Sequence, residues 1–159
     1  MNDTAFRSSE SVDDALRSDH ERLDGLLVNL ESAVAAGLLA APRVLRSFAD
    51  ALLHHMSWED QSLFPAVKRL ASEKERRSIE SLEIDHERLR DTLQSLESSL
   101  AAGDGATAGT LVDWLKTLLK GHNYDEEHGV YVEADRLLSH AERRRLIDRF
   151  TAGLPRDPT

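Results

Sequence analysis

The chain contains an internal repeat, and this repeat restricts the folds that are open to it. The pentapeptide DHERL stands at residues 19–23 and again at 85–89. At the same distance after each copy come LESAVAAG (30–37) and LESSLAAG (96–103). Two copies are too few for a solenoid, which needs several stacked repeats to bury its core. We therefore predict one domain built from two duplicated helical hairpins.

The second halves of the two copies match more loosely. LLHHMSWEDQSLF (52–64) aligns with LLKGHNYDEEHGVY (118–131). The second segment has one extra residue, which stands before His122. The alignment pairs three positions that carry side chains of similar kind: His55 with His122, Glu59 with Glu126, and Phe64 with Tyr131.

Hydrophobic residues in both copies recur at helical spacing. Apolar positions alternate in steps of three and four residues, and His20 completes this series in the first copy as His86 does in the second. Such spacing is typical of the inward-facing stripe of helices in a bundle. We predict a short fifth helix after Ser139 and four long helices before it, at 12–36, 43–70, 73–102 and 107–138.

Residues that begin and end helices support these boundaries. Gly37 and Gly103 follow the last apolar positions of the first and third helices, where a left-handed residue is preferred. Ser72 and Ser139 each precede a glutamate by three residues, which is the capping-box pattern. Pro65 lies inside the second predicted helix and is expected to kink or end it.

The short connections between these helices make neighbours antiparallel. We therefore predict an all-α fold, an up-and-down four-helix bundle over residues 12–138. Residues 1–11 are expected to be disordered, and residues 139–159 to form the short C-terminal helix and a frayed tail.

Composition excludes several classes of function. The 159 residues include no cysteine, which excludes disulfides, thiolate metal sites and a cysteine nucleophile. A net charge of -9 disfavours binding to nucleic-acid phosphates. No apolar run approaches the ~20 residues of a membrane span, and the N-terminus lacks the apolar core of a signal peptide. We expect a cytoplasmic protein with no nucleic-acid or membrane partner.

Six polar residues of metal-binding type fall on the inward stripes. Each copy contributes one histidine from its first helix and an H-x-x-x-E pair from its second, and a four-residue step keeps such a pair on one helix face. Burying these groups unpaired would be costly, and metal ions remove that cost. The six candidate ligands are His20, His55, Glu59, His86, His122 and Glu126.

Four imidazoles and two carboxylates suit two ions of borderline hardness. A carboxylate can bridge two metals whereas an imidazole ends on one, so the simplest arrangement has Glu59 and Glu126 as bridges and two histidines on each ion. Which histidines share an ion does not follow from the sequence. Iron is the first choice of metal, with manganese and zinc behind it, because zinc alone is more often mononuclear.

The order H, H-x-x-x-E, H, H-x-x-x-E resembles the hemerythrin-like, HHE cation-binding domains. The resemblance spans about residues 12–136, and HMSWEDQSLFP (55–65) is similar to the second helix of that family. It implies a four-helix bundle with a non-haem di-iron centre, bridged by an oxo or hydroxo group. Family members bind O₂, sense oxygen or iron, handle nitric oxide or peroxide, or repair iron centres.

Two departures separate this chain from the oxygen-carrying hemerythrins. Those proteins have an H-x-x-x-H pair on the third helix, whereas Leu82 stands four residues before His86 here. They also have H-x-x-x-x-D on the fourth helix, where this chain has His122 and Glu126. The resemblance thus points to the four-histidine, two-glutamate subgroup of iron sensors and repair proteins, and the missing ligand favours reactivity over O₂ carriage. The absence of cysteine argues against the usual repair role.

The sequence thus predicts a non-haem di-iron protein that binds or senses O₂, nitric oxide or peroxide. Two alternatives stay open at this stage. One is a di-iron enzyme that decomposes peroxide or nitric oxide in the manner of a catalase or peroxidase. The other is an iron-sensing or iron-storage interaction module.

Other residues near the candidate ligands have weaker assignments. His54 is expected behind the ligands or at the surface, with a fifth histidine ligand as the alternative. Trp58 and Tyr124 lie near the ligands in sequence; ordinary packing is the first expectation for them, and a cavity wall or a hydrogen-bond partner behind the ligands is the alternative. His128 and His140 are expected at the periphery of the fold.

Asp19 and Asp85 directly precede the histidines of the two DHERL segments. They lie on a neighbouring helix face, so they could accept hydrogen bonds from other ligands. Solvation at the helix surface is the alternative.

Overall fold

The computed structural model describes residues 11–37 and 39–154. These residues form helices and no strand, as predicted. In chain order the helices are α1 (Val12–Ala35), α2 (Ala41–Trp58), the π-helical turn η1 (Glu59–Leu63), α3 (Phe64–Lys68), α4 (Glu73–Ala101), α5 (Gly105–Glu127), α6 (Val130–Leu137) and α7 (His140–Ala152). None of them is both long and apolar enough to span a membrane.

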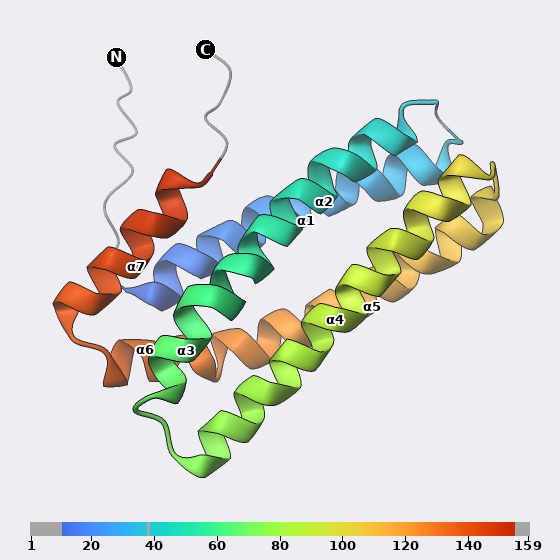
Figure 1. Cartoon of the computed structure of the whole chain (residues 1–159). Helices are drawn as coiled ribbons and strands as arrows, with labels where there is room; N and C mark the ends of the chain where they lie inside the picture. Colours follow the sequence, from blue (N-terminus) through green and yellow to red (C-terminus); the bar gives the residue numbers. More distant parts are fainter. Residues whose placement is uncertain (1–10, 38, 155–159) are drawn as a thin grey trace, which may run out of the picture.

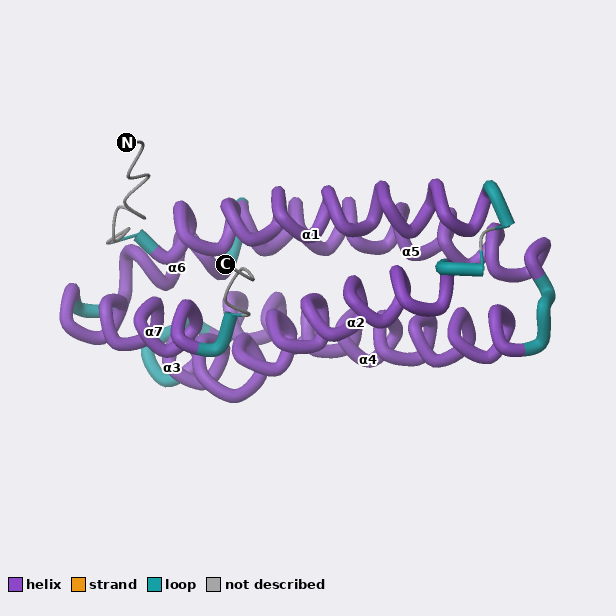
Figure 2. Tube along the Cα trace, turned by 90° about the horizontal axis from the view of Figure 1, so that it is seen from above, coloured by secondary structure: helices purple, strands orange, loops and turns teal. Residues whose placement is uncertain are grey.

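The four long helices form a bundle of two antiparallel hairpins (Figure 1). α1 packs against α2 and α5, and α4 packs against the same two helices. Seen from above, α1 and α5 make one layer, and α2 and α4 make the other (Figure 2). The predicted bundle is therefore confirmed, and α7 (His140–Ala152) is the predicted fifth helix.

The predicted helix caps are also present. Ser72 and Ser139 each form a full capping box at the start of α4 and α7. Gly37 and Gly103 adopt φ values of 60° and 72°, the left-handed region that glycine tolerates best. Of the segment predicted to be disordered, only Ser11 is described, and it caps α1; residues 1–10 and 155–159 lie outside the described residues.

The second predicted helix, 43–70, is interrupted just before Pro65, where a kink or an end is expected. The regular helix α2 ends at Trp58 and widens into the π-turn η1, where the Phe64 N–H donates to the Glu59 carbonyl. Proline has no N–H to donate. The wider turn lets the chain continue into α3 with Phe64 and Val67 still buried.

The fourth predicted helix, 107–138, is wrong in its continuity. It ends at Glu127 and restarts as α6 at Val130. Gly129 lies in the break with φ -127° and ψ -99°, and a Cβ there would lie 2.6 Å from the Asp125 carbonyl oxygen. Only glycine fits this break, which redirects the chain so that Tyr131 is fully buried in the core.

The buried apolar side chains form two clusters with a polar layer between them. On α1, His20 lies between Leu16 of one cluster and Leu23 of the other. On α4, His86 lies in the same way between Leu82 and Leu89. The fold therefore places the polar residues of the inward stripes at one level of the bundle.

Candidate metal centre

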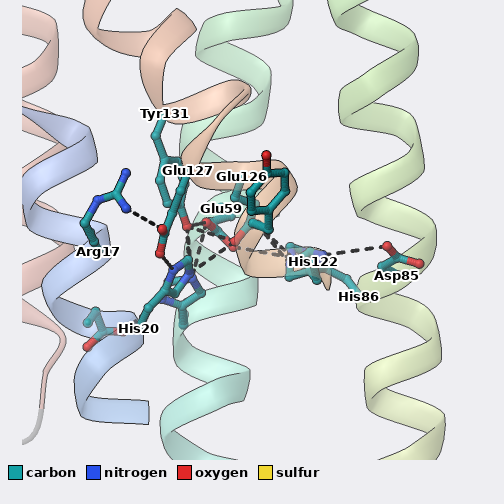
Figure 3. A network of polar contacts seen from close by, with 12 residues as sticks. Arg17, His20, Glu59, Asp85, His86, His122, Glu126, Glu127 and Tyr131 are labelled. Atoms are coloured by element: carbon teal, nitrogen blue, oxygen red, sulfur yellow. Dashed lines mark hydrogen bonds and ion pairs between the residues drawn. The ribbon is translucent and has the colours of Figure 1, made fainter. Parts of the chain in front are cut away.

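The six candidate ligands lie together in this polar layer. Each is at most 3% exposed, and Glu59, His86 and Glu126 are fully buried. Figure 3 shows side chains from different helices converging on one point. The structure thus brings together every residue that the repeat singled out as a ligand.

The histidines group into two pairs, and each pair comes from one hairpin. The ring centroids of His20 and His55 are 4.9 Å apart, and those of His86 and His122 are 4.8 Å apart. The first pair forms a compact group of donor atoms with Glu126, and the second pair forms another with both glutamates. The two groups of donor atoms therefore follow the hairpins.

Each glutamate turns one oxygen toward each histidine pair. The Oε1 atom of Glu59 lies 3.3 Å from His55 Nε2, and its Oε2 lies 3.4 Å from His86 Nε2. The Oε2 atom of Glu126 lies 3.2 Å from His20 Nε2, and its Oε1 lies 2.9 Å from His122 Nε2. Two carboxylates in this orientation can each bridge two ions.

The donor set on the second pair fits a cation. Glu59 Oε2 and Glu126 Oε1 are buried without a hydrogen-bond partner. His86 Nε2 and His122 Nε2 face each other at 3.1 Å. Because the Nδ1 atom of His86 lies 2.7 Å from Asp60, a neutral His86 presents a lone pair on Nε2. A buried cluster of acceptors like this is costly unless a proton or a metal ion lies among them.

In the metal-free site that positive charge is carried by protons. Burial alone would lower the pKa of His55, but the charge of Glu59 and the hydrogen bond to Asp19 outweigh it and raise the pKa to about 10. Burial is likewise outweighed at His86, where the hydrogen bond to Asp60 and the nearby carboxylates of Glu126 and Glu59 raise the pKa to about 11. Metal ligands must be deprotonated, so ion binding at these histidines would release protons.

A carboxylate lies behind each histidine, on the side away from the glutamates. Such a partner keeps the proton on Nδ1 and leaves Nε2 for the site. Three of the four contacts are hydrogen bonds, and the fourth is too long. The Nδ1–carboxylate distances are 2.8 Å for His20 with Glu127, 2.8 Å for His55 with Asp19, 2.7 Å for His86 with Asp60, and 3.9 Å for His122 with Asp85.

The repeat accounts for this outer ring of carboxylates. The aspartate of each DHERL segment faces the second-helix histidine of its own hairpin. The acidic residue that follows Glu59 or Glu126 faces the first-helix histidine of the other hairpin. Each carboxylate also accepts from an arginine on its outer side, which holds it in place. These pairs are Arg22 with Asp19, Arg88 with Asp85, Arg90 with Asp60, and Arg17 with Glu127.

The DHERL segments indicate two of the four carboxylates in this ring, Asp19 and Asp85. The expectation for Asp19 is confirmed by its bond to His55, whereas Asp85 stops short of hydrogen-bonding distance from His122. The roles of Asp60 and Glu127 went unrecognised. The signal was present, because an acidic residue follows the glutamate of both H-x-x-x-E motifs.

Tyr131 is the main site residue that sequence reasoning missed. Its hydroxyl donates to Glu59 Oε1 at 2.6 Å and lies 3.0 Å from Glu126 Oε2. The same oxygen lies 3.1 Å from His20 Nε2 and 3.3 Å from His55 Nε2. Burial and the charges of the two glutamates raise the pKa of Tyr131 well above its usual value.

Tyr124 does not lie behind the ligands, and that alternative is wrong. Its side chain is 61% exposed and stacks on His128 with ring centroids 4.0 Å apart. The cause is its helix position, because a residue two places before Glu126 points about 200° away from it. His128 is peripheral, as expected, and His140 is exposed at the start of α7.

His54 and Trp58 face α7 rather than the donor atoms. His54 Nε2 lies 3.4 Å from the Phe150 carbonyl oxygen, and the two rings stack. Trp58 packs on Phe150 with ring centroids 5.0 Å apart. Phe150 also meets the ring of the candidate ligand His55 edge-on at 6.0 Å. These residues therefore attach α7 as a cover beside the first histidine pair.

The structure is a helical-bundle domain with a buried set of donor atoms that could hold a metal ion. The hemerythrin HHE cation-binding domain family matches residues 11–134. Because the match covers most of the chain, the chain belongs to this family. It ends before α7, so the cover over His55 lies outside the matched region. Comparison with curated proteins and with solved structures finds no significant match.

Proposed function

We propose that this chain is a non-haem di-iron protein that binds or senses O₂, nitric oxide or peroxide in its bundle core. The observation that carries the proposal is the orientation of Glu59 and Glu126, each with one oxygen toward each histidine pair. Membership of a cation-binding family supports the same conclusion.

The donor types favour iron. Imidazole and carboxylate together suit ions of borderline hardness, and the chain has no cysteine to select a thiophilic metal. Bound iron would supply reversible one-electron chemistry to a small ligand. His20 and His55 would hold one ion, His86 and His122 the other, and Glu59 and Glu126 both.

The remaining residues of the site orient the ligands and exclude water. Three of the arginine-held carboxylates hydrogen-bond to imidazole rings and fix them, as in other metal sites where outer partners orient the ligands. Phe64 stacks on His86 with ring centroids 5.5 Å apart, and Phe150 covers His55. A site this deeply buried favours a diatomic molecule or peroxide over a larger substrate.

Metal analysis combined with optical spectroscopy tests the proposal. Protein purified without oxygen is expected to hold two irons per chain and to gain near-ultraviolet and visible absorption on exposure to air, peroxide or nitric oxide. Zinc alone, or no metal and no spectral response after reconstitution with ferrous iron, would contradict it. Sustained decomposition of peroxide that is lost in Glu59→Ala would identify the enzyme alternative instead.

A further inference from the structure

One buried polar group touches the donor atoms without belonging to the four-histidine, two-glutamate set. We infer that Tyr131 is itself a metal ligand, whose phenolate oxygen binds the ion held by His20 and His55. The inference rests on the proposed function, and it adds a residue that the H-x-x-x-E motifs do not contain.

The position of the hydroxyl oxygen supports ligation. It lies 2.6 to 3.3 Å from four donor atoms, on Glu59, Glu126, His20 and His55. Neighbouring donors are themselves separated by similar distances, 3.2 Å for His20 with Glu126 and 3.3 Å for His55 with Glu59.

These distances put the hydroxyl oxygen among the donors, at the spacing that separates the two donors of each of these pairs. A hydroxyl oxygen at this spacing is placed to bind the same ion as a further donor.

The two halves of the site differ at this position. The repeat aligns Tyr131 with Phe64, which has no oxygen and stacks on His86. On the Tyr131 side the glutamate oxygens have a phenol partner, whereas Glu59 Oε2 and Glu126 Oε1 on the other side have none.

This difference predicts where an external ligand binds. The ion beside Tyr131 gains one donor from the protein, and the ion held by His86 and His122 does not. We therefore expect O₂, nitric oxide or peroxide to bind at the His86/His122 ion.

Ligation changes the protonation of Tyr131. In the metal-free protein the phenol hydroxyl donates its proton to Glu59 Oε1 at 2.6 Å. Cations at the two positions would reverse the sign of the local charge. The oxygen–hydrogen bond of the phenol then breaks, an oxygen–metal bond forms, and the proton leaves to solvent.

The chain has two tyrosines, which makes the test selective. Phenolate bound to ferric iron gives a visible charge-transfer band, and excitation in that band enhances the ring vibrations of tyrosine in the Raman spectrum. The protein would be loaded with ferrous iron and oxidised with ferricyanide. The control variant is Tyr124→Phe, which removes the exposed tyrosine and leaves Tyr131 alone.

The expected result is a charge-transfer band with tyrosine vibrations in both the wild type and Tyr124→Phe. In Tyr124→Phe these vibrations should shift when ring-deuterated tyrosine is incorporated, and in Tyr131→Phe they should be absent. If Tyr131→Phe does not fold, the deuterium shift in Tyr124→Phe decides the matter alone.

Two results would overturn the inference, and they are distinguishable. Tyr124→Phe that holds two irons but shows no tyrosine vibrations excludes Tyr131 as a ligand and leaves the proposed function standing. Protein that takes up no iron at all removes the proposed function and the inference together.

Discussion

The two halves of the metal centre come from a duplicated sequence, yet they are not equivalent. In the first half the Nδ1 atoms of His20 and His55 both lie 2.8 Å from a carboxylate, and the hydroxyl of Tyr131 caps the donors. In the second half His86 is held in the same way, but His122 Nδ1 has no hydrogen-bond partner and no phenol is present.

The repeat preserves the candidate ligands in both halves and varies the residues around them. Both halves keep the order of histidines and glutamate, so both can hold an ion. The differences lie at positions around the ligands, such as Phe64 against Tyr131 and Asp60 against Glu127. Residues outside the ligand motif therefore give the two donor groups different surroundings.

The largest expected effect comes from removing a residue that both halves share. Glu126→Ala should abolish the binding of both irons, because Glu126 belongs to both groups of donor atoms. Iron content per chain is the measurement, with Glu97→Ala, an exposed change on α4, as the matched control. Iron content equal to that of the control would show that Glu126 does not bridge.

Removing a histidine should affect one half only. His55→Ala and His122→Ala should each reduce iron from two ions to one per chain, since each histidine belongs to a single donor group. His140→Ala, an exposed change at the start of α7, should keep both ions. The same iron content in all three variants would refute the ligand assignment.

The outer carboxylates offer a finer test of the asymmetry. Asp19→Asn should weaken metal affinity by about 10–100-fold, the usual effect of losing a partner that orients a ligand. Asp85→Asn should have a clearly smaller effect, because Asp85 lies 3.9 Å from His122. Competition with a chelator measures both affinities. Equal losses in the two variants would mean that the outer partners of the two halves are equivalent.

The smallest expected effect is a loss of folding stability in the metal-free protein as the pH rises. The folded-state pKa values of His55 and His86, about 10 and about 11, lie above the ordinary value of 6.5. Their protonation therefore stabilises the fold fully below pH 6.5, and this stability is lost as the pH rises through the folded-state values.

Denaturant midpoints between pH 6 and 11 measure this loss. They should fall with pH in the metal-free protein and stay flatter in the iron-loaded protein, where ions replace the protons. A metal-free protein whose stability does not decrease over this range would contradict the charge balance described for the site.

Much of the fold was predictable because it follows from periodic patterns. The spacing of apolar residues gave the long helices, and the pairs Ser72 with Glu75 and Ser139 with Glu142 gave two helix starts. The duplicated motifs also predicted which six polar residues would meet in the core.

The local breaks were not predictable from those patterns. The apolar spacing continues through Gly129, so the end of α5 left no periodic signal. Pro65 predicts that the helix is disturbed, but not that the disturbance takes the form of the π-turn η1. Tyr131 reads as an ordinary core aromatic until the break at Gly129 fixes its direction. The features that the sequence did not predict thus depend on irregularities of the backbone, whereas the predicted ones depend on which residues share a helix face.

The most direct test of the account is a Mössbauer spectrum of protein loaded with the Mössbauer-active iron isotope, taken together with iron content. The account predicts two irons per chain in two distinct quadrupole doublets of equal area, one for each half of the site. A single doublet with two irons would contradict the asymmetry between the halves. One iron per chain, or none, would contradict the di-iron centre itself.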